Sequence, residues 1–325
     1  MKLIAVAFVL VLALASYSRN AMADANQSGS SVVAPRGART APSAAPPATG
    51  DDPVLIGAGD IADCTDLSGA EATAKLLEAN PGTVMAIGDL AYPDGTKENF
   101  SCYDETWGRV KSRTRPAVGN HEFHSTSATF YFQYFGSMAG DFKDGFYSYN
   151  LGAWHIVVLN SECAEVGGCS AGSREEKWLR ADLAAHPAAC TLAYFHKPLF
   201  SSGAKHGNDP DIQPLFQALY DAHADVIVAG HDHDYERFAL QAPTGAADPK
   251  QGIREFVAGT GGKSHRPFAE PRPNSEIRDD TAFGVLKFVL HPTGYDWLFI
   301  PEPGKAFTDS GSDRCHGSVA KGKPR

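Results

Sequence analysis

Short apolar runs alternate with glycine-marked loops and helical segments through most of the chain. Val54–Ala58 and Val84–Ile87 are apolar runs of strand length, and each is followed by a glycine and then an aspartate. The segment between them, Ala70–Ala79, has the composition of a helix. This order of strand, loop and helix then repeats, which is typical of an α/β domain with a partly parallel sheet.

The remaining apolar runs extend this pattern. Strands are expected at Arg115–Val118, Phe146–Tyr149, His155–Leu159, Thr191–Phe195 and Val226–Ala229, and helices at Ser173–Ala185 and Ile212–His223. In the last third, four runs predict antiparallel strands that close a second sheet: Phe238–Leu240, Glu255–Val257, Val285–Leu290 and Tyr295–Ile300. We therefore expect an α/β fold, a four-layer αββα sandwich of two mixed β-sheets flanked by helices.

The two ends of the chain have a different composition. Residues 1–23 combine an early lysine, an apolar run and a final Ala-Met-Ala step, which predicts a cleaved secretory signal peptide. An uncleaved anchor is the alternative, although the run is shorter than the roughly 20 residues of a spanning helix. Residues 24–50 are rich in Ala, Pro, Ser and Gly and predict a flexible linker. This leaves 51–302 as one folded domain and 303–325 as a polar tail that Cys315 could tether.

The charge balance is acidic and spread along the chain. Lys and Arg number 29 against 38 Asp and Glu, which gives a formal net charge of -9. Because nucleic-acid-binding domains usually carry a basic patch, this balance argues against a nucleic-acid partner. No segment after the signal peptide has the apolarity of a membrane span, so we expect a secreted or periplasmic monomer.

The six cysteines all follow the signal peptide: Cys64, Cys102, Cys163, Cys169, Cys190 and Cys315. An even number in an exported chain predicts disulfides, although the pairing is formally open. Cys163 and Cys169 flank a Gly-Gly turn and are expected to close a small loop. Cys64 could pair with Cys102, which would leave the last two cysteines to each other. Zinc binding is the alternative, but the chain has no C-x-x-C pair.

Five short blocks concentrate side chains that bind metals. They read Gly59-Asp60, Gly88-Asp89-Leu90-Ala91-Tyr92, Gly119-Asn120-His121-Glu122, Tyr194-Phe195-His196 and Gly230-His231-Asp232-His233. Each follows a predicted strand, and in open α/β folds the carboxyl ends of strands gather at one edge. Asp, Asn, His and Tyr are ligands for closely spaced metal ions that activate water. The blocks therefore indicate hydrolysis of a phosphate ester.

Four of the five blocks also have an ordinary structural explanation when taken alone. Asp60 and Asp89 could be helix N-caps. Tyr92 could be a packing aromatic, and Asn120 could hydrogen-bond its own turn. His196 could be a core histidine with satisfied hydrogen bonds. The occurrence of all five blocks in one chain favours the metal site.

In this order the blocks resemble those of the calcineurin-like metallophosphoesterases. Tyr92 narrows the resemblance to the purple acid phosphatases, in their compact form. The resemblance covers residues 53–300, and it implies the four-layer metallophosphoesterase fold with 51–302 as the catalytic domain. The first block departs from the family pattern, because Ala62 stands where these enzymes usually have glycine. That departure leaves the geometry of the first loop open.

The resemblance also implies roles for individual residues. Three resemble the ligands of a ferric ion, Fe(III): Asp60, Tyr92 and His233. Three resemble the ligands of a divalent ion, which would be Zn, Mn or Fe(II): Asn120, His196 and His231. Asp89 resembles the bridge between the two ions. His121 and His206 resemble the histidines that, in cationic form, bind the phosphate or protonate the leaving group.

The sequence thus predicts a secreted binuclear-metal phosphatase, which hydrolyses phosphate monoesters by in-line attack of a metal-activated hydroxide. The expected partner is a small phosphate-ester substrate. A phosphodiesterase of the same superfamily is the first alternative, and a non-catalytic, phosphate-binding secreted protein is the second. Gly259–Gly262 is interpreted as a turn beside the site, because it lacks the Gly-Lys-Ser or Gly-Lys-Thr ending of a P-loop.

Overall fold

The structure is a computed structural model that describes residues 52–142 and 144–317. The predicted signal peptide, residues 1–23, and the predicted linker, residues 24–50, lie outside the described residues. No helix in the described ranges has both the length and the apolarity needed to cross a bilayer.

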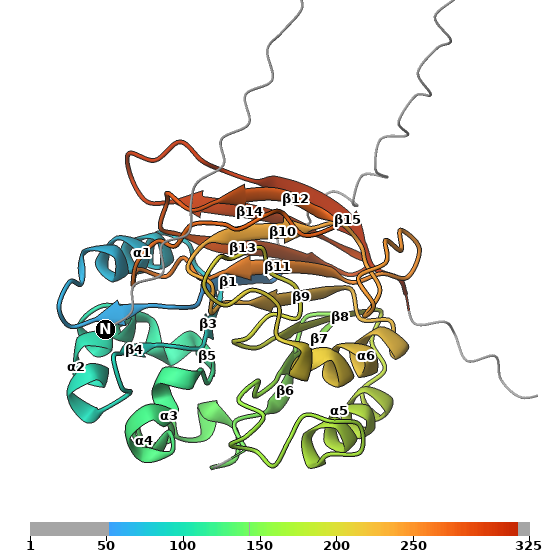
Figure 1. The fold of residues 1–325 in the computed structure, drawn as a ribbon, viewed down its shortest axis with the longest axis horizontal. Coiled ribbons are helices and arrows are strands. Elements are labelled where there is room, and N and C mark those ends of the chain that lie inside the picture. Colours follow the sequence, from blue (N-terminus) through green and yellow to red (C-terminus); the bar gives the residue numbers. More distant parts are fainter. Residues whose placement is uncertain (1–51, 143, 318–325) are drawn as a thin grey trace, which may run out of the picture. The chain divides into compact units, whose positions relative to one another are not determined.

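Two β-sheets form the centre of the fold (Figure 1). The first contains β1 (Val54–Ala58), β3 (Thr83–Ile87), β5 (Thr114–Ala117), β13 (Gly284–His291), β14 (Gly294–Pro301) and β15 (Ser310–Arg314). Their order in the sheet is β15-β14-β13-β1-β3-β5. β1, β3 and β5 are parallel, whereas β13 is antiparallel to both β1 and β14, so the sheet is mixed.

The second sheet contains β6 (Tyr147–Leu151), β7 (Trp154–Val158), β8 (Cys190–Tyr194), β9 (Val226–Ala229), β10 (Tyr235–Phe238), β11 (Arg254–Ala258) and β12 (Ser275–Asp279). Their order is β12-β10-β11-β9-β8-β7-β6. The four central strands are parallel and the outer ones antiparallel. A small parallel pair, β2 (Ala62–Asp63) and β4 (Ala91–Tyr92), stands apart from both sheets.

Helices lie on the outer faces of both sheets. Those beside the first sheet are α1 (Ser68–Ala79), α2 (Lys97–Glu105), α3 (Asn120–Thr126), α4 (Thr129–Phe135) and the 3-10 helices η1 (Trp107–Arg113) and η2 (Gly136–Ala139). Those beside the second are α5 (Arg174–Ala185), η3 (Pro210–Ile212) and α6 (Gln213–Asp221). α5 begins where the sequence predicts, because the Ser173 hydroxyl accepts the backbone N–H of Glu176.

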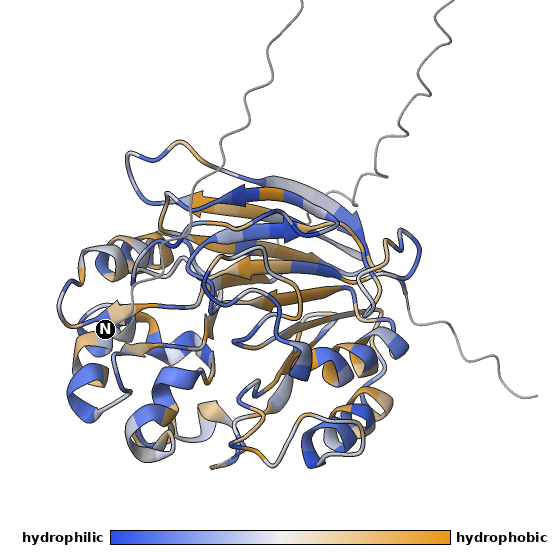
Figure 2. Ribbon diagram, in the orientation of Figure 1, coloured by the Kyte–Doolittle hydropathy of each residue, from blue (hydrophilic) through white to orange (hydrophobic). Residues whose placement is uncertain are grey.

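Successive side chains of a strand point to opposite faces of its sheet, which explains the four layers. In β1, Leu55 faces the second sheet and packs in the same cluster as Val228, whereas the next residue, Ile56, packs with Leu77 of α1. A third cluster places Val157 of β7 against Leu179 of α5. Strands that are buried on both faces read as continuous apolar runs, as Figure 2 shows for both sheets. The predicted αββα sandwich is confirmed.

The predicted topology of the last third is wrong in part. The sequence predicts that all four apolar runs close a second sheet, but β10 and β11 join the second sheet while β13 and β14 extend the first. β11 is also parallel to β9 rather than antiparallel. An apolar pattern reports which faces of a strand are buried, but it carries no information on which edge the strand joins.

The tail predicted from residue 303 contains a strand. β15 pairs with β14 along Ser310–Arg314, so the first sheet continues beyond residue 302. Its sequence is polar, because β15 is an edge strand, and the apolar pattern therefore missed it.

Three disulfides use all six cysteines: Cys64–Cys102, Cys163–Cys169 and Cys190–Cys315. The suggested pairing is confirmed, and the zinc alternative is excluded because no cysteine is free. The third disulfide joins the start of β8 in the second sheet to the residue after β15 in the first. It therefore links the two sheets covalently.

Candidate functional site

Five strands end at the same edge of the two sheets and carry the five blocks. β1, β3 and β5 precede the blocks of Asp60, Asp89 and Asn120, and β8 and β9 precede those of His196 and His231. Backbone hydrogen bonds connect the blocks within each sheet. The N–H of Asp60 donates to the carbonyl of Gly88 at 3.1 Å, and that of Gly230 donates to the carbonyl of His196 at 2.9 Å. The predicted gathering of the blocks is therefore observed.

Two glycines allow one block to pack against a side chain of another. A Cβ on Gly119 would lie 2.3 Å from Oδ1 of Asp89. A Cβ on Gly88 would lie 2.6 Å from the ring of His196, and Gly88 also has a φ of +72°. Any other residue at these positions would force the candidate ligands apart.

Three of the seven candidate ligands have a left-handed backbone. The φ angles are 62° for Asp60, 51° for Asp89 and 72° for His231. For residues other than glycine this conformation costs of order 1 kcal/mol each and persists only where the surroundings enforce it. Here the N–H of His231 donates to Oδ2 of Asp60 at 2.8 Å, which ties two of the strained residues together. Such outliers concentrate at functional sites.

One half of the site surrounds the hydroxyl of Tyr92. This hydroxyl donates to Oδ1 of Asp60 at 2.7 Å and lies 3.1 Å from Oδ2 of Asp89. Nε2 of His233 lies 3.2 Å from the same hydroxyl and 3.2 Å from Oδ1 of Asp60. Four buried side chains therefore direct three oxygens and one nitrogen at one another.

The other half of the site also includes Asp89, together with His196, His231 and Asn120. Nε2 of His196 lies 3.1 Å from Oδ2 of Asp89 and 3.1 Å from Nδ1 of His231. Oδ1 of Asn120 is buried and has no hydrogen-bond partner among the described residues. Oδ2 of Asp89 is within hydrogen-bond distance of both Tyr92 and His196, so it lies between the two halves.

Hydrogen bonds outside the cluster fix which nitrogen of each ring faces it. Nδ1 of His196 lies 2.9 Å from the carbonyl of Ile87, which leaves Nε2 toward Asp89. Nδ1 of His233 lies 2.7 Å from Oγ of Ser264, which leaves Nε2 toward Asp60. Histidines that bind metals are usually held in this way through their second nitrogen.

The electrostatics of the cluster favour a cation. Although burial opposes the shift, His196 and His121 hold the pKa of Asp89 well below its ordinary value. Against the effect of burial, the carboxylates of Asp89 and Asp60 raise the pKa of His196 to about 10. Burial and the same carboxylates raise the pKa of Tyr92. Buried negative charges that stabilise a protonated imidazole would also stabilise a bound metal ion.

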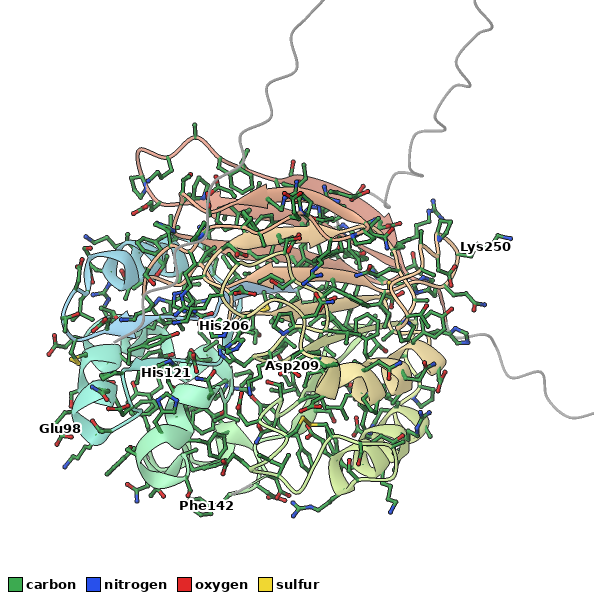
Figure 3. All side chains as sticks on the ribbon, in the orientation of Figure 1. Glu98, His121, Phe142, His206, Asp209 and Lys250 are labelled. Atoms are coloured by element: carbon green, nitrogen blue, oxygen red, sulfur yellow. A yellow bond between two sulfur atoms is a disulfide. The ribbon has the colours of Figure 1, made fainter. Side chains whose placement is uncertain are left out.

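The two histidines predicted outside the ligand set lie next to the cluster, and Figure 3 labels both. Nδ1 of His121 contacts the carbonyl of Pro93, which leaves its Nε2 3.7 Å from Oδ2 of Asp89. The ring of His206 lies 3.9 Å from that of His231, measured between centroids. Burial lowers the pKa of both His121 and His206, which favours their neutral forms rather than the cationic forms expected from sequence.

Glu122 supports the ligand-bearing loops, whereas the sequence left open whether it is a supporting or a solvated acid. It is fully buried, and its carboxylate accepts the backbone N–H groups of Asp89, Leu90, Ala91 and Gly119 at 2.8 to 3.2 Å. One side chain thereby holds two ligand-bearing loops together. The only sequence signal was its place at the end of the Gly-Asn-His-Glu block.

Asp232 connects the last block to the loop that carries His206. Its carboxylate accepts the hydroxyl of Ser201 at 2.5 Å and the backbone N–H groups of Gly207 and His206 at 2.9 and 3.3 Å. A Cβ on Gly203 would lie 2.1 Å from its Cγ. Asp232 therefore positions His206 against His231 without facing the cluster.

Two smaller expectations concern the loops beside the site. The turn Gly259–Gly262 does lie there, since the N–H of Gly261 donates to the carbonyl of Gly59 at 2.8 Å. Ala62, which departs from the family pattern, lies in β2, and its φ is not positive. Alanine therefore fits the first loop without backbone strain.

Known proteins have sequences similar to this chain. The family model for calcineurin-like phosphoesterases matches residues 55–235. Purple acid phosphatase 15 of Arabidopsis thaliana is 27% identical over 201 residues, which cover 50% of this chain and 37% of that protein. Acid phosphatase type 7 of Danio rerio is 24% identical over 277 residues, which cover 73% and 59%. The matches span less than half the length of the first Arabidopsis relatives.

Two solved structures have a similar fold. Purple acid phosphatase PPD1 from yellow lupin seeds, Lupinus luteus, has a TM-score of 0.63 at 20% identity, covering 82% of this chain and 54% of that one. GAP50, described as the anchor in the inner membrane complex of Plasmodium, has a TM-score of 0.61 at 13% identity, covering 81% and 89%. At these identities the likeness shows the fold alone.

Proposed function

Because the chain belongs to the calcineurin-like phosphoesterase family and resembles the purple acid phosphatases within it, we propose that it is a secreted phosphatase that uses two metal ions to hydrolyse phosphate monoesters. The observation that carries the proposal is the buried Oδ1 of Asn120, which has no hydrogen-bond partner among the described residues, although the N–H of the next residue, His121, donates to Oδ1 of Asp89 in the candidate cluster. Leaving such an atom unsatisfied costs about 1–3 kcal/mol, which a cation would offset.

The residues present fit two ions. On one side stand Asp60, Tyr92 and His233, a set suited to Fe(III) through the phenolate of Tyr92. On the other side stand Asn120, His196 and His231, a set suited to Zn, Mn or Fe(II). Asp89 would bridge them. When bound, the two ions would supply an activated water and neutralise charge on the phosphate oxygens.

The chain's own residues would orient the ester and form hydrogen bonds to its phosphate oxygens or leaving group. Because Pro93 fixes Nδ1 of His121, the Nε2 of His121 is available on the side of Asp89. We assign His121 and His206 to hydrogen-bonding the phosphate oxygens or the leaving alkoxide. Glu122 and Asp232 hold the loops on which these two histidines depend. This part of the proposal requires hydrogen-bond donors and does not depend on a cationic imidazole.

Two alternatives are distinguished by experiment. A phosphodiesterase would have the same ligands and differ in the groups around the ester. A non-catalytic protein would share only the fold. All seven candidate side chains are present in this chain, which favours catalysis.

The first test compares hydrolysis of an aryl phosphate with that of the corresponding bis-aryl diester. We expect the monoester to be hydrolysed at least about tenfold faster, since each tenfold corresponds to 1.36 kcal/mol of barrier. A faster reaction with the diester would establish the first alternative. No turnover of either compound by metal-replete protein would establish the second.

The second test measures metal content and the visible spectrum. A tyrosinate bound to ferric iron is expected to give a purple or pink colour, and Tyr92→Phe is expected to bleach it while the protein stays folded. A colourless and fully active protein with two zinc or two manganese ions would overturn the assignment of Fe(III) to Tyr92 and keep the phosphoesterase class.

A further inference from the structure

An arginine without a carboxylate partner lies beside the candidate site. The backbone N–H of Arg266 donates to the carbonyl of His233 at 3.1 Å, which fixes Arg266 next to the last ligand block. Its Nη1 donates to Nε2 of His206 at 2.6 Å. Among the described residues, no Asp or Glu oxygen forms an ion pair with its guanidinium.

Arg266 is not alone in this, because Arg113, Arg115, Arg272, Arg278 and Arg314 also form no ion pair with a carboxylate among the described residues. Five other arginines form ion pairs with carboxylates: Arg109, Arg174, Arg180, Arg237 and Arg254. Asp232 is an acidic residue near His206, but its oxygens already accept hydrogen bonds from Ser201, His206 and Gly207. Arg266 therefore keeps most of its five N–H donors available.

Two further cations border the same loop. Lys205 precedes His206 and is exposed. Nη2 of Arg272 would lie 3.6 Å from a Cβ on Gly207, and its Nε donates to the carbonyl of Ser201 at 3.3 Å. Neither forms an ion pair with a carboxylate in residues 52–142 or 144–317. We call Lys205, Arg266 and Arg272 the basic rim.

The guanidinium of Arg266 is connected to the ligand cluster through His206. His231 belongs to the cluster, the ring of His206 lies 3.9 Å from the ring of His231, and Nη1 of Arg266 contacts Nε2 of His206. Arg266, His206 and His231 therefore form a chain of contacts that ends at a candidate ligand. A phosphate bound at the cluster would contact His206 first, and Arg266 would face whatever extends beyond that phosphate.

We propose that Arg266 is a specificity-determining residue that binds a second anionic group of the substrate, a phosphate or carboxylate carried by the leaving group. This inference rests on the proposed function and names the substrate class of the same site. A guanidinium suits this role because its planar fork binds phosphate or carboxylate through two parallel hydrogen bonds. The preferred substrates are thus phosphate monoesters whose alcohol carries another negative charge.

Three substrates that differ only at the far end of one propyl chain test the proposal: propyl phosphate, 3-phosphonooxypropanoate and propane-1,3-diol bisphosphate. Arg266→Ala is expected to raise KM for at least one of the two substrates with a second anion by about tenfold, which is typical for the loss of a charge-assisted contact. The change for propyl phosphate should be clearly smaller. Arg266→Lys should recover part of the loss, because the charge remains and the fork does not.

The result depends on how the effect of Arg266→Ala on KM differs between the three substrates. A larger effect on the bisphosphate than on the carboxylate identifies phosphate as the second anion, and the reverse identifies carboxylate. Equal effects on all three substrates, or none, would overturn the proposal. Lys250→Ala is the matched control, because Lys250 is an exposed cation outside the basic rim (Figure 3) and its loss should change no KM.

A binding measurement separates this inference from the proposed function. Calorimetric titration of the full-length protein with inorganic phosphate and with inorganic diphosphate should show that Arg266→Ala weakens diphosphate binding more than phosphate binding. If no ester is hydrolysed but this difference appears, the phosphatase assignment fails and the anion site stands. If esters are hydrolysed but both anions bind equally to the wild type and the variant, the role of Arg266 is refuted.

Discussion

Two clusters of histidine and aspartate in the described part of the chain have the same residue types but different surroundings. One contains Asp89, His196 and His231, at the edge where the ligand-bearing strands end. The other contains His155, Asp182 and His186, on β7, on α5 and just after α5. In both clusters the possible ligand atoms lie within 4.8 Å of one another. Proximity therefore does not distinguish them.

In the second cluster, most side-chain nitrogens and oxygens already have partners within the protein. Nε2 of His155 lies 2.8 Å from Oδ2 of Asp182, and its Nδ1 lies 3.1 Å from Oδ1 of Asn150. Oδ1 of Asp182 accepts the hydroxyl of Ser148 at 2.9 Å and lies 3.0 Å from Nδ1 of His186. The cluster therefore stabilises the packing of α5 on the second sheet and has little capacity left for a ligand.

The first cluster differs in two respects. Asp89 and His231 have positive φ angles, and the neighbouring Asn120 has a buried oxygen without a partner among the described residues. A protein keeps strain and unsatisfied atoms where function requires them, because neither contributes to stability. We infer that the first cluster is the better candidate for a metal site, because its strained backbone and its unpaired neighbour are absent from the second cluster.

The sharpest test of this comparison substitutes one aspartate in each cluster and compares the two variants. Asp89→Ala is expected to lower kcat/KM for an aryl phosphate by about a thousandfold or more, because a lost bridging ligand removes several kcal/mol of transition-state stabilisation. Asp182→Asn should leave kcat/KM and metal content almost unchanged. Metal content is measured together with kinetics. A loss of bound metal in Asp182→Asn but not in Asp89→Ala would reverse the assignment of the two clusters.

The second cluster should matter for stability instead. Asp182→Ala removes the buried carboxylate that His155 and His186 share, so we expect the free energy of unfolding to fall by about 3 kcal/mol. His186→Ala is the control, because the His186 side chain is 49% exposed and its loss should cost less than about 1 kcal/mol. Denaturant unfolding measures both. Equal losses in the two variants would show that the buried carboxylate is not the centre of this cluster.

The fold was predictable because both sheets bury long apolar runs on two faces. β1 and β3 illustrate this, since each lies within one residue of its predicted bounds. The edge strands β12 and β15 were not predictable, because their sequences are polar and their pairing depends on a neighbour distant in the chain. The dependence on a distant neighbour also explains why the apolar strands β13 and β14 were placed in the wrong sheet.

The candidate site was predictable where its residues stand in sequence blocks. Asp60 and Asp89 each follow a glycine at a strand end, so their gathering followed from the strands. Three further residues act through partners on other loops: Glu122, Asp232 and Arg266. No local sequence pattern predicts such contacts. Sequence therefore indicated which side chains gather at the site, and structure was needed to show what holds them there.

Glu122 provides a smaller test, because it positions ligands and belongs to neither cluster. Glu122→Gln replaces an acceptor oxygen by an N–H donor that faces backbone N–H groups, so both ligand-bearing loops should shift. We expect kcat/KM and metal affinity to fall by about 10- to 100-fold, as for other groups that orient metal ligands. The exposed Glu98, labelled in Figure 3, provides the matched control Glu98→Gln, which should change neither. Unchanged metal affinity in Glu122→Gln would contradict the positioning role.

The smallest expected effect concerns Glu255, a second buried carboxyl that supports a loop beside the site. Its Oε1 accepts the N–H groups of Leu199 and Phe200, and burial raises its pKa from 4.5 to about 8. Between these two values the folded protein holds a proton that the unfolded chain has lost, so this group's contribution to stability falls as pH rises. Below pH 4.5 both states are protonated and the contribution is fully present.

Glu255→Gln removes this pH dependence, because glutamine does not titrate and keeps an oxygen for the two N–H groups. Relative to the wild type, the variant should gain about 1 kcal/mol of stability when the pH rises from 6 to 7, since one proton contributes at most about 1.4 kcal/mol per pH unit. Denaturant unfolding at both pH values measures this gain. A constant difference between the two proteins would mean that Glu255 is ionised in the folded state, so that the N–H groups of Leu199 and Phe200 outweigh the effect of burial.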